Sequence, residues 1–299
     1  MRLSTSTNIY FNRPDGTKAD IRDSIALCAQ AGYRVMDMNF HDCTTFRNAF
    51  VGRHWRQWVE EIRAAAQVHG IEFSQGHAPF YNFCDPGYDK REWHDRMICR
   101  AVDCARILGI PWLVIHAGTD FSAADSFASS KRLNREYLLP LLEYAERQGV
   151  GIAVENLWDL NIAPLKRYTA SAEELVDLVD SLDAPNVGIC FDVEHATIMK
   201  QDVPAQLRLI GGRLKATHVS DVINTDSDHM LPFAGRTDWP PFLTALREIG
   251  YQGDFTYEIH RYTASLPDAL VPSALAYSVE VGQYLLSLGQ GDGQEKKPQ

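Results

Sequence analysis

Short apolar runs alternate with longer amphipathic segments along most of the 299-residue chain. The runs have the length of buried strands, and the segments repeat apolar residues every three or four positions, as one face of a helix does. In the first segment the apolar positions are Ile21, Ile25, Cys28 and Ala29, and Gly32 is a natural helix end. The pattern therefore predicts an α/β protein in which strands and helices alternate.

Eight strand–helix units can be placed along the chain. Strands are expected at 2–9, 33–39, 71–74, 111–116, 151–155, 187–192, 214–219 and 255–259. Helices are expected at 19–32, 55–69, 92–108, 131–148, 171–182, 203–210, 237–249 and 265–288. Eight evenly spread units predict a closed (β/α)8 TIM barrel rather than an open, doubly wound sheet. Residues 1–288 would form this single domain, and the polar, glycine-rich residues 289–299 a disordered tail.

Polar side chains follow six of the apolar runs at the point where each run ends. They are His77, His116, Glu155, Asp192, His218 and Glu258. In enzymes with this barrel the active site lies at the carboxyl ends of the strands. We therefore expect these six side chains to converge in space.

Four of the six close the fifth to eighth strands in succession: Glu155, Asp192, His218 and Glu258. Three carboxylates and one imidazole form a hard, mostly oxygen ligand set. We expect this set to hold one divalent metal ion, Mn²⁺ in the first place, with Mg²⁺, Co²⁺ or Zn²⁺ as alternatives. Without a cation the carboxylates would repel one another, and some of their pKa values would rise.

The composition of the chain limits its possible binding partners and its cellular compartment. Hydrophobic residues make up 45% of the chain, and the formal charge is −10 without a block of Lys or Arg, which disfavours a nucleic-acid partner. None of the six cysteines forms a CxxC pair, the N-terminus lacks a long apolar signal region, and no run approaches the roughly 20 apolar residues of a membrane helix. The expectation is a cytoplasmic protein with reduced thiols and no membrane partner.

The strand endings resemble those of the xylose-isomerase-like TIM barrels. The resemblance is carried by Val154-Glu-Asn156, Phe191-Asp-Val-Glu-His195, His218-Val-Ser-Asp221 and Tyr257-Glu258. It covers the chain except the tail, and the family includes sugar epimerases and isomerases, inosose dehydratases, hydroxypyruvate isomerases and an AP-endonuclease branch. The pieces are moderately specific for the superfamily and weakly specific for any one activity in it.

In the sugar-epimerase branch, the resemblance implies one divalent metal ion bound by Glu155, Asp192, His218 and Glu258. It also implies that Glu155 and Glu258 act as the acid/base pair on a small sugar or polyol, and that the chain self-associates into a homo-oligomer. The chemistry is coherent, because a metal ion chelated by the substrate oxygens stabilises the charge of a cis-enediolate. Two carboxylates can then remove a proton from one side and return it on the other.

Further residues are candidates for contacts with substrate. His195 would hydrogen-bond a substrate oxygen, or would simply belong to the turn after its strand. His77 and His116 would contact sugar hydroxyls, or would be buried structural histidines. Asp221 is a candidate for a hydroxyl contact, and Trp158 for packing against a sugar face or within the barrel.

The AP-endonuclease branch supplies a rival hypothesis, a three-metal phosphodiesterase. There the resemblance makes His77, His116, His195 and His229 candidate zinc ligands beside the four residues named above. The family's Asp two residues before the last of these histidines is Ser227 in this chain, which counts against that branch. In the epimerase hypothesis His229 belongs to the substrate pocket.

Two more alternatives stay open. An inosose-type dehydratase would form the same early enolate and then expel water, and the sequence does not separate the two reactions. A sugar-binding barrel without catalysis would need a pocket without a metal ion. Arg236 and Arg261 are the arginines at the mouth that could contact a phosphate or carboxylate, although they do not by themselves indicate a phosphorylated substrate.

Overall fold

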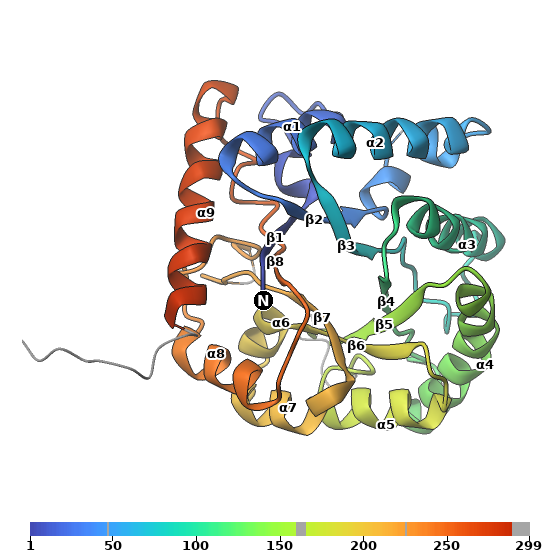
Figure 1. The fold of residues 1–299 in the computed structure, drawn as a ribbon. Coiled ribbons are helices and arrows are strands. Elements are labelled where there is room, and N and C mark those ends of the chain that lie inside the picture. Colours follow the sequence, from blue (N-terminus) through green and yellow to red (C-terminus); the bar gives the residue numbers. More distant parts are fainter. Residues whose placement is uncertain (47, 160–165, 225, 289–299) are drawn as a thin grey trace, which may run out of the picture.

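A computed structural model describes residues 1–46, 48–159, 166–224 and 226–288 of the chain, and the predicted tail at 289–299 lies outside these ranges. Eight parallel strands form one sheet in the order β7-β6-β5-β4-β3-β2-β1-β8. A bridge between Val219 and Tyr257 joins β7 to β8, so the strands close into a ring that the helices surround (Figure 1). The predicted (β/α)8 barrel is confirmed.

The strands agree with the predicted positions to within a few residues. They are β1 (Leu3–Ser6), β2 (Val35–Asn39), β3 (Glu72–His77), β4 (Trp112–His116), β5 (Gly151–Glu155), β6 (Val187–Asp192), β7 (Leu214–His218) and β8 (Phe255–Tyr257). The first strand is shorter than predicted because the chain turns into a 3-10 helix at Thr7. The third is longer and carries its hydrogen-bonded ladder as far as His77.

The α-helices of the described residues are α1 (Ile21–Ala31), α2 (Trp55–His69), α3 (Arg91–Leu108), α4 (Ser126–Arg147), α5 (Ala172–Leu182), α6 (Val193–Ile198), α7 (Val203–Ile210), α8 (Trp239–Glu248) and α9 (Val271–Leu288). Helix α4 begins five residues earlier than predicted because the Asp125 side chain accepts a hydrogen bond from the Ala128 amide and caps it. Helix α6 was not predicted, and it starts directly after β6. None of the helices described has the length and apolar character needed to cross a bilayer.

Small side chains fill the middle of the barrel. Val114, Ala153, Cys190 and Ala216 form a buried layer of their own inside the strands. Because side chains alternate between the two faces of a strand, the residue two positions later on each strand also points inward. Those residues are His116, Glu155, Asp192 and His218. The filled middle layer is thus the floor beneath the polar residues at the carboxyl end.

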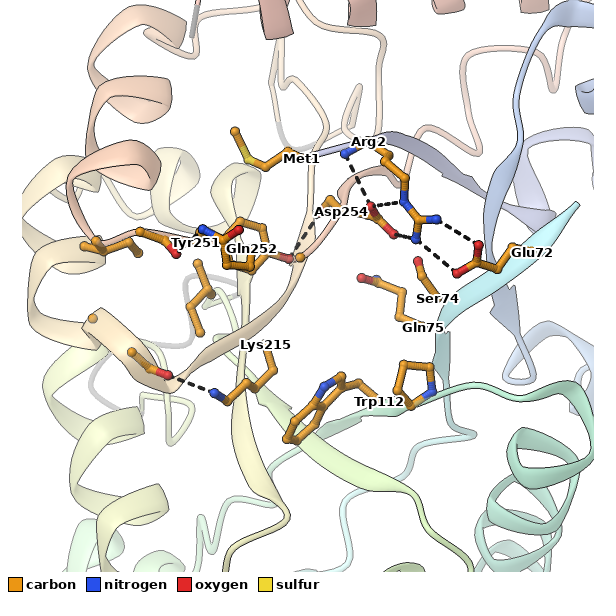
Figure 2. A pocket seen from close by; sticks show the side chains of 17 residues that line it. Met1, Arg2, Glu72, Ser74, Gln75, Trp112, Lys215, Tyr251, Gln252 and Asp254 are labelled. Carbon is orange, nitrogen blue, oxygen red and sulfur yellow. Dashed lines mark hydrogen bonds and ion pairs between the residues drawn. The ribbon is translucent and has the colours of Figure 1, made fainter. Parts of the chain in front are cut away.

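The opposite, amino-terminal end of the barrel holds a cavity of about 640 Å³. Figure 2 shows Arg2 at its edge, bonded to Asp254 and to Glu72. These contacts, both 2.8 Å, tie the starts of β1, β8 and β3 together. Trp112 and Lys215 cover the barrel interior from this side, over Gly151 and Gly188, where a Cβ atom would collide with them. The strand-end acids and histidines lie at the other end of the barrel.

Candidate active site

Glu155, the last residue of β5, lies among three imidazoles. Its side chain is 1% exposed, with Oε2 at 3.3 Å from His77 Nε2 and 3.0 Å from His116 Nε2. Oε1 is 2.9 Å from His218 Nδ1. The histidines end β3, β4 and β7, so the strand ends bring three of the other predicted residues to the Glu155 carboxylate.

His218 connects Glu155 with Glu258, the residue that follows β8. The Nδ1 atom that contacts Glu155 is also 3.3 Å from Glu258 Oε2. The amide of Glu258 donates to the carbonyl of Val219 at 3.0 Å, in the ladder that closes the barrel. Closure between β7 and β8 is therefore what brings the second glutamate to the site.

A buried polar pair beneath His218 was missed by the sequence analysis. Asp37 Oδ2 lies 3.6 Å from His218 Nε2, and Gln75 Nε2 donates to the same oxygen at 2.9 Å. Thr256 Oγ1 in turn donates to Gln75 Oε1 at 3.2 Å. The signal in the sequence is a polar residue in mid-strand, where an apolar one would ordinarily fill the barrel.

Asp192 ends β6 and pairs in register with His218. Its Oδ1 accepts a hydrogen bond from the His195 amide at 2.9 Å and caps α6. Its Oδ2 is buried and has no hydrogen-bond partner among the described residues, although His195 Nε2 is 3.6 Å away. His195 Nδ1 is 2.7 Å from the Asn156 carbonyl, which leaves Nε2 on the cavity side. All four predicted metal ligands thus lie on one arc of the rim.

Imidazoles compensate the buried charge of the site. Burial would raise the pKa of Glu155, but His218 and His116 outweigh it and hold that pKa well below its usual value. Burial would lower the pKa of His218, but Cys190, Glu258 and Glu155 raise it well above normal. The rise in pKa expected for some carboxylates of the set does not occur at Glu155, because the neighbouring histidines outweigh its burial.

The loop between β7 and α8 carries His229 into the site. Its Nε2 is 3.7 Å from Glu258 Oε2, and its amide donates to Glu194 Oε2 at 2.7 Å. Burial would lower the pKa of His229, but Asp228, Glu194 and Glu258 raise it to about 10. Burial raises the pKa of Glu194 to about 7. The sequence analysis passed over Glu194, which lies two residues after Asp192 in the first turn of the unpredicted α6.

Asp221 is buried and turned toward its own loop. Its carboxylate accepts the backbone amides of Val222, Gly235 and Thr237 at 2.9 to 3.0 Å. These bonds shape the loop that holds His229. Asp221 does not line the cavity that contains Glu155 and Glu258, so the predicted contact with a substrate hydroxyl is not supported. Trp158 does line it, with its ring 6.5 Å from that of His195.

Two cavities meet at this end of the barrel. The inner cavity, about 360 Å³, is lined by four of the six strand-end residues, His77, His116, Glu155 and Glu258, and not by Asp192 or His218. The outer cavity, about 400 Å³, lies beside it. Four residues line both: Phe80, His116, Leu157 and Arg167. Arg261, which the sequence placed at the mouth, is bonded to Asp228 at 2.5 Å, and Arg236 is exposed and lines neither cavity. Arg167 was missed, although a basic residue shortly after the strand that ends in Glu155 was a usable signal.

The donor atoms suit a divalent cation. The buried Oδ2 of Asp192 lacks a hydrogen-bond partner among the described residues, as expected of an atom placed for another ligand. Several triads have donor atoms within 4.8 Å of one another, among them His77–His116–Glu155, His77–His218–Glu258 and Asp192–His195–His229. Carboxylate and imidazole donors together fit Mn²⁺, Co²⁺ or Zn²⁺.

Known proteins with similar sequences include sugar epimerases and isomerases. The chain is 24% identical over 246 residues to a D-psicose 3-epimerase of Enterocloster bolteae, covering 79% of this chain and 75% of that protein. It is 28% identical over 137 residues to an inosose isomerase of Bacillus velezensis, covering 44% and 47%.

The fold agrees with solved structures over nearly the whole chain. The crystal structure of the IOLI protein with a bound zinc atom superimposes with a TM-score of 0.77, at 18% identity, over 96% of this chain and 98% of that one. The model of one family, the xylose isomerase-like TIM barrel, matches residues 25–280. Barrel, strand-end cluster and family match agree, and the chain belongs to the xylose isomerase-like TIM barrel family.

Proposed function

We propose that this protein is a divalent-metal-dependent isomerase or epimerase of a small sugar or polyol, acting by proton abstraction next to a carbonyl through a cis-enediolate. The observation that carries the proposal is the approach of Glu155 and Glu258 to the same nitrogen of His218, at 2.9 and 3.3 Å. Two carboxylates from different strands thus border one small volume. The similarity to a D-psicose 3-epimerase and an inosose isomerase supports the same class of reaction.

Glu155 and Glu258 would share the proton transfers. A substrate carbon held between them would lose its proton to one carboxylate and receive a proton from the other. Return to the opposite side of the same carbon inverts it, and return to the neighbouring carbon moves the carbonyl. The low pKa of Glu155 favours its ionised form, which is the form that a base needs.

A bound metal ion and several side chains of the site would bind and orient the sugar. Glu155, Asp192, His218 and Glu258 would hold the metal ion, which supplies positive charge that stabilises the enediolate oxygens. His195, whose Nδ1 donates to the Asn156 carbonyl, would accept a hydrogen bond at Nε2 from a substrate hydroxyl. His77 and His116 are in reach of the same volume, and Trp158 offers a ring to the C–H face of a sugar.

Deuterium exchange tests the proposal. The Mn²⁺-loaded protein, incubated in heavy water with a panel of keto-sugars and inososes, should introduce deuterium at the carbon next to the carbonyl. Glu258→Gln should slow this exchange by roughly 10²–10⁴-fold, because it removes a general acid/base. Glu280→Gln, an exposed glutamate on α9, should leave it unchanged. Absence of exchange with every sugar would refute the proposal, and exchange followed by loss of water would identify the dehydratase.

One structural observation favours a second candidate, the multi-metal phosphodiesterase. The triads His77–His116–Glu155 and Asp192–His195–His229 could each hold a further ion. Against it, Ser227 replaces an expected acidic ligand, and the neighbouring Asp228 is bonded to Arg261. Elemental analysis of the purified protein separates the two, since one ion per chain supports the isomerase and three support the phosphodiesterase.

A further inference from the structure

Arg167 borders both the inner and the outer cavity. It is the one Lys or Arg among the described residues that line either of them. Phe80 lies between the two spaces, with its ring stacked on His116 at 4.1 Å and on His41 at 3.7 Å. A ligand that extends from the strand-end cluster past Phe80 would therefore reach the side chain of Arg167.

The Arg167 guanidinium has no carboxylate partner among the described residues. Its backbone amide donates to Asp159 Oδ1 at 2.6 Å, but that carboxylate makes no ion pair with the side chain. Burial lowers the pKa of Arg167, and Asp159 opposes this only through its charge. The neighbouring segment 160–165 reads Leu-Asn-Ile-Ala-Pro-Leu and contributes no acidic side chain. A partly buried guanidinium stays charged, and leaving it without a counter-charge costs free energy.

The other polar groups of the outer cavity already bond to the protein. Asn82 donates to the Thr119 carbonyl and accepts the Thr119 amide, both at 2.9 Å. Tyr81 Oη donates to Asp95 at 2.6 Å, and Tyr88 Oη lies 3.0 Å from His94 Nδ1. The outer cavity therefore presents aromatic faces together with the donors of one guanidinium.

We propose that Arg167 binds a carboxylate or phosphate group of the substrate, so that the sugar taken by this site is acidic. The inference rests on the proposed function and names its substrate class. The planar guanidinium donates two parallel hydrogen bonds to such a group, which a neutral hydroxyl does not match. The carbonyl end of the sugar lies at the glutamates, and its anionic end lies at the junction of the two cavities.

Three sugars that differ only at carbon six test the inference on the Mn²⁺-loaded protein: D-fructose, D-fructuronate and D-fructose 6-phosphate. Deuterium exchange gives kcat/KM for each, and calorimetry gives the affinity. At least one acidic sugar should exceed D-fructose about tenfold or more in kcat/KM, and the better of the two shows whether the group is a carboxylate or a phosphate. Arg167→Gln should reduce the acidic-to-neutral ratio about tenfold or more, as expected for loss of a hydrogen bond between charged groups.

Two variants serve as controls. Arg236→Gln removes an exposed positive charge from the same end of the barrel and should leave the ratio unchanged. Arg167→Lys keeps the charge without the planar fork and should restore part of the preference. An unchanged ratio in Arg167→Gln, a preference for D-fructose, or no binding of either acidic sugar to the wild type would overturn the inference.

The outcome is distinguishable from failure of the proposed function. If no sugar exchanges deuterium but the wild type binds an acidic sugar and Arg167→Gln does not, the acidic-ligand site stands and the isomerase proposal falls. If D-fructose exchanges and no acidic sugar is preferred, the isomerase proposal stands and the role of Arg167 falls.

Discussion

His218 shows how much of the site depends on a single side chain. One ring nitrogen faces the two glutamates and the other faces Asp37, which Gln75 holds by a 2.9 Å hydrogen bond. A carboxylate behind a ligating histidine fixes the orientation of its ring and raises its basicity. We therefore interpret Asp37 as a positioning residue that acts through His218.

Asp37→Asn should weaken Mn²⁺ binding by about 10- to 100-fold, the usual effect of losing such a partner. Calorimetric titration of the metal-free protein measures it. Asp226→Asn, at an exposed position, is the control and should bind Mn²⁺ as the wild type does. Equal affinity in Asp37→Asn would show that the ring of His218 is held by its other contacts.

His41 links the site to acid sensitivity. Its ring stacks on Phe80, and burial, then His77 and His116, lower its pKa to about 3. The unfolded chain takes up this proton near pH 6.5, whereas the folded protein does not. Between pH 6.5 and 3 the unfolded state therefore binds more protons, and the free energy of unfolding falls as the pH falls.

His41→Gln should make that decline shallower, by up to about 1 kcal/mol per pH unit below 6.5. Urea unfolding of the metal-free protein at pH 7, 6 and 5 measures the slope. His54→Gln, at an exposed position, should retain the wild-type slope. A slope unaffected by loss of His41 would contradict a neutral, partly buried imidazole at this position.

At the scale of elements, the ends of β8 decide the geometry of the barrel. Arg2 and Asp254 join β1 and β8 at the bottom, and the Val219–Tyr257 bridge joins β7 and β8 near the top. Immediately after this bridge, the loop to α8 returns His229 toward Glu258. His229 has a positive φ of 51°, and Phe233 one of 74°, so this loop holds a conformation that side chains other than glycine adopt at a cost.

Asp221 holds this loop through hydrogen bonds to three of its backbone amides. Asp221→Ala would remove the acceptor of three backbone amides, the buried one of Val222 and the partly buried ones of Gly235 and Thr237, and should lower the free energy of unfolding by about 2 kcal/mol. Urea unfolding measures the loss, and hydrogen exchange should show faster exchange across 220–237. Asp226→Ala is the matched change at an exposed position of the same loop and should have little effect. Normal protection of these amides in Asp221→Ala would refute the role.

At the scale of the whole molecule, metal binding and folding should be linked. The proposed ligands come from β5, β6, β7 and the residue after β8, so an unfolded chain cannot assemble them. An ion that binds only the folded state stabilises it by about 2.7 kcal/mol when its concentration is 100 times Kd. The predicted homo-oligomer stays a prediction at this scale.

Addition of Mn²⁺ at 100 times its Kd should raise the free energy of unfolding of the metal-free protein by about 2.7 kcal/mol. Chelation should reverse the gain, as urea unfolding with and without EDTA would show. Asp192→Asn should lose most of the increment at the same Mn²⁺ concentration. A gain that persists in this variant would place the ion elsewhere.

The alternation of strands and helices could be predicted because it depends on the local spacing of apolar residues along the chain. So could the polar residues that end the strands, since parallel strands deliver their carboxyl ends to one side of a sheet. Glu155, Asp192, His218 and Glu258 were found by this rule, and the structure places them on one arc of the rim. The rule needs only the position of each residue in its own strand.

Contacts between distant segments were decided by the tertiary structure. The approach of Asp37 and Gln75 to His218 depends on which inward side chains face each other after the ring closes. Asp221 turned to its own loop, and Arg167 took its place where two cavities meet. The physical reason is that periodicity determines which face of an element a side chain occupies, whereas its partners are determined by closure, loop course and packing among residues far apart in sequence.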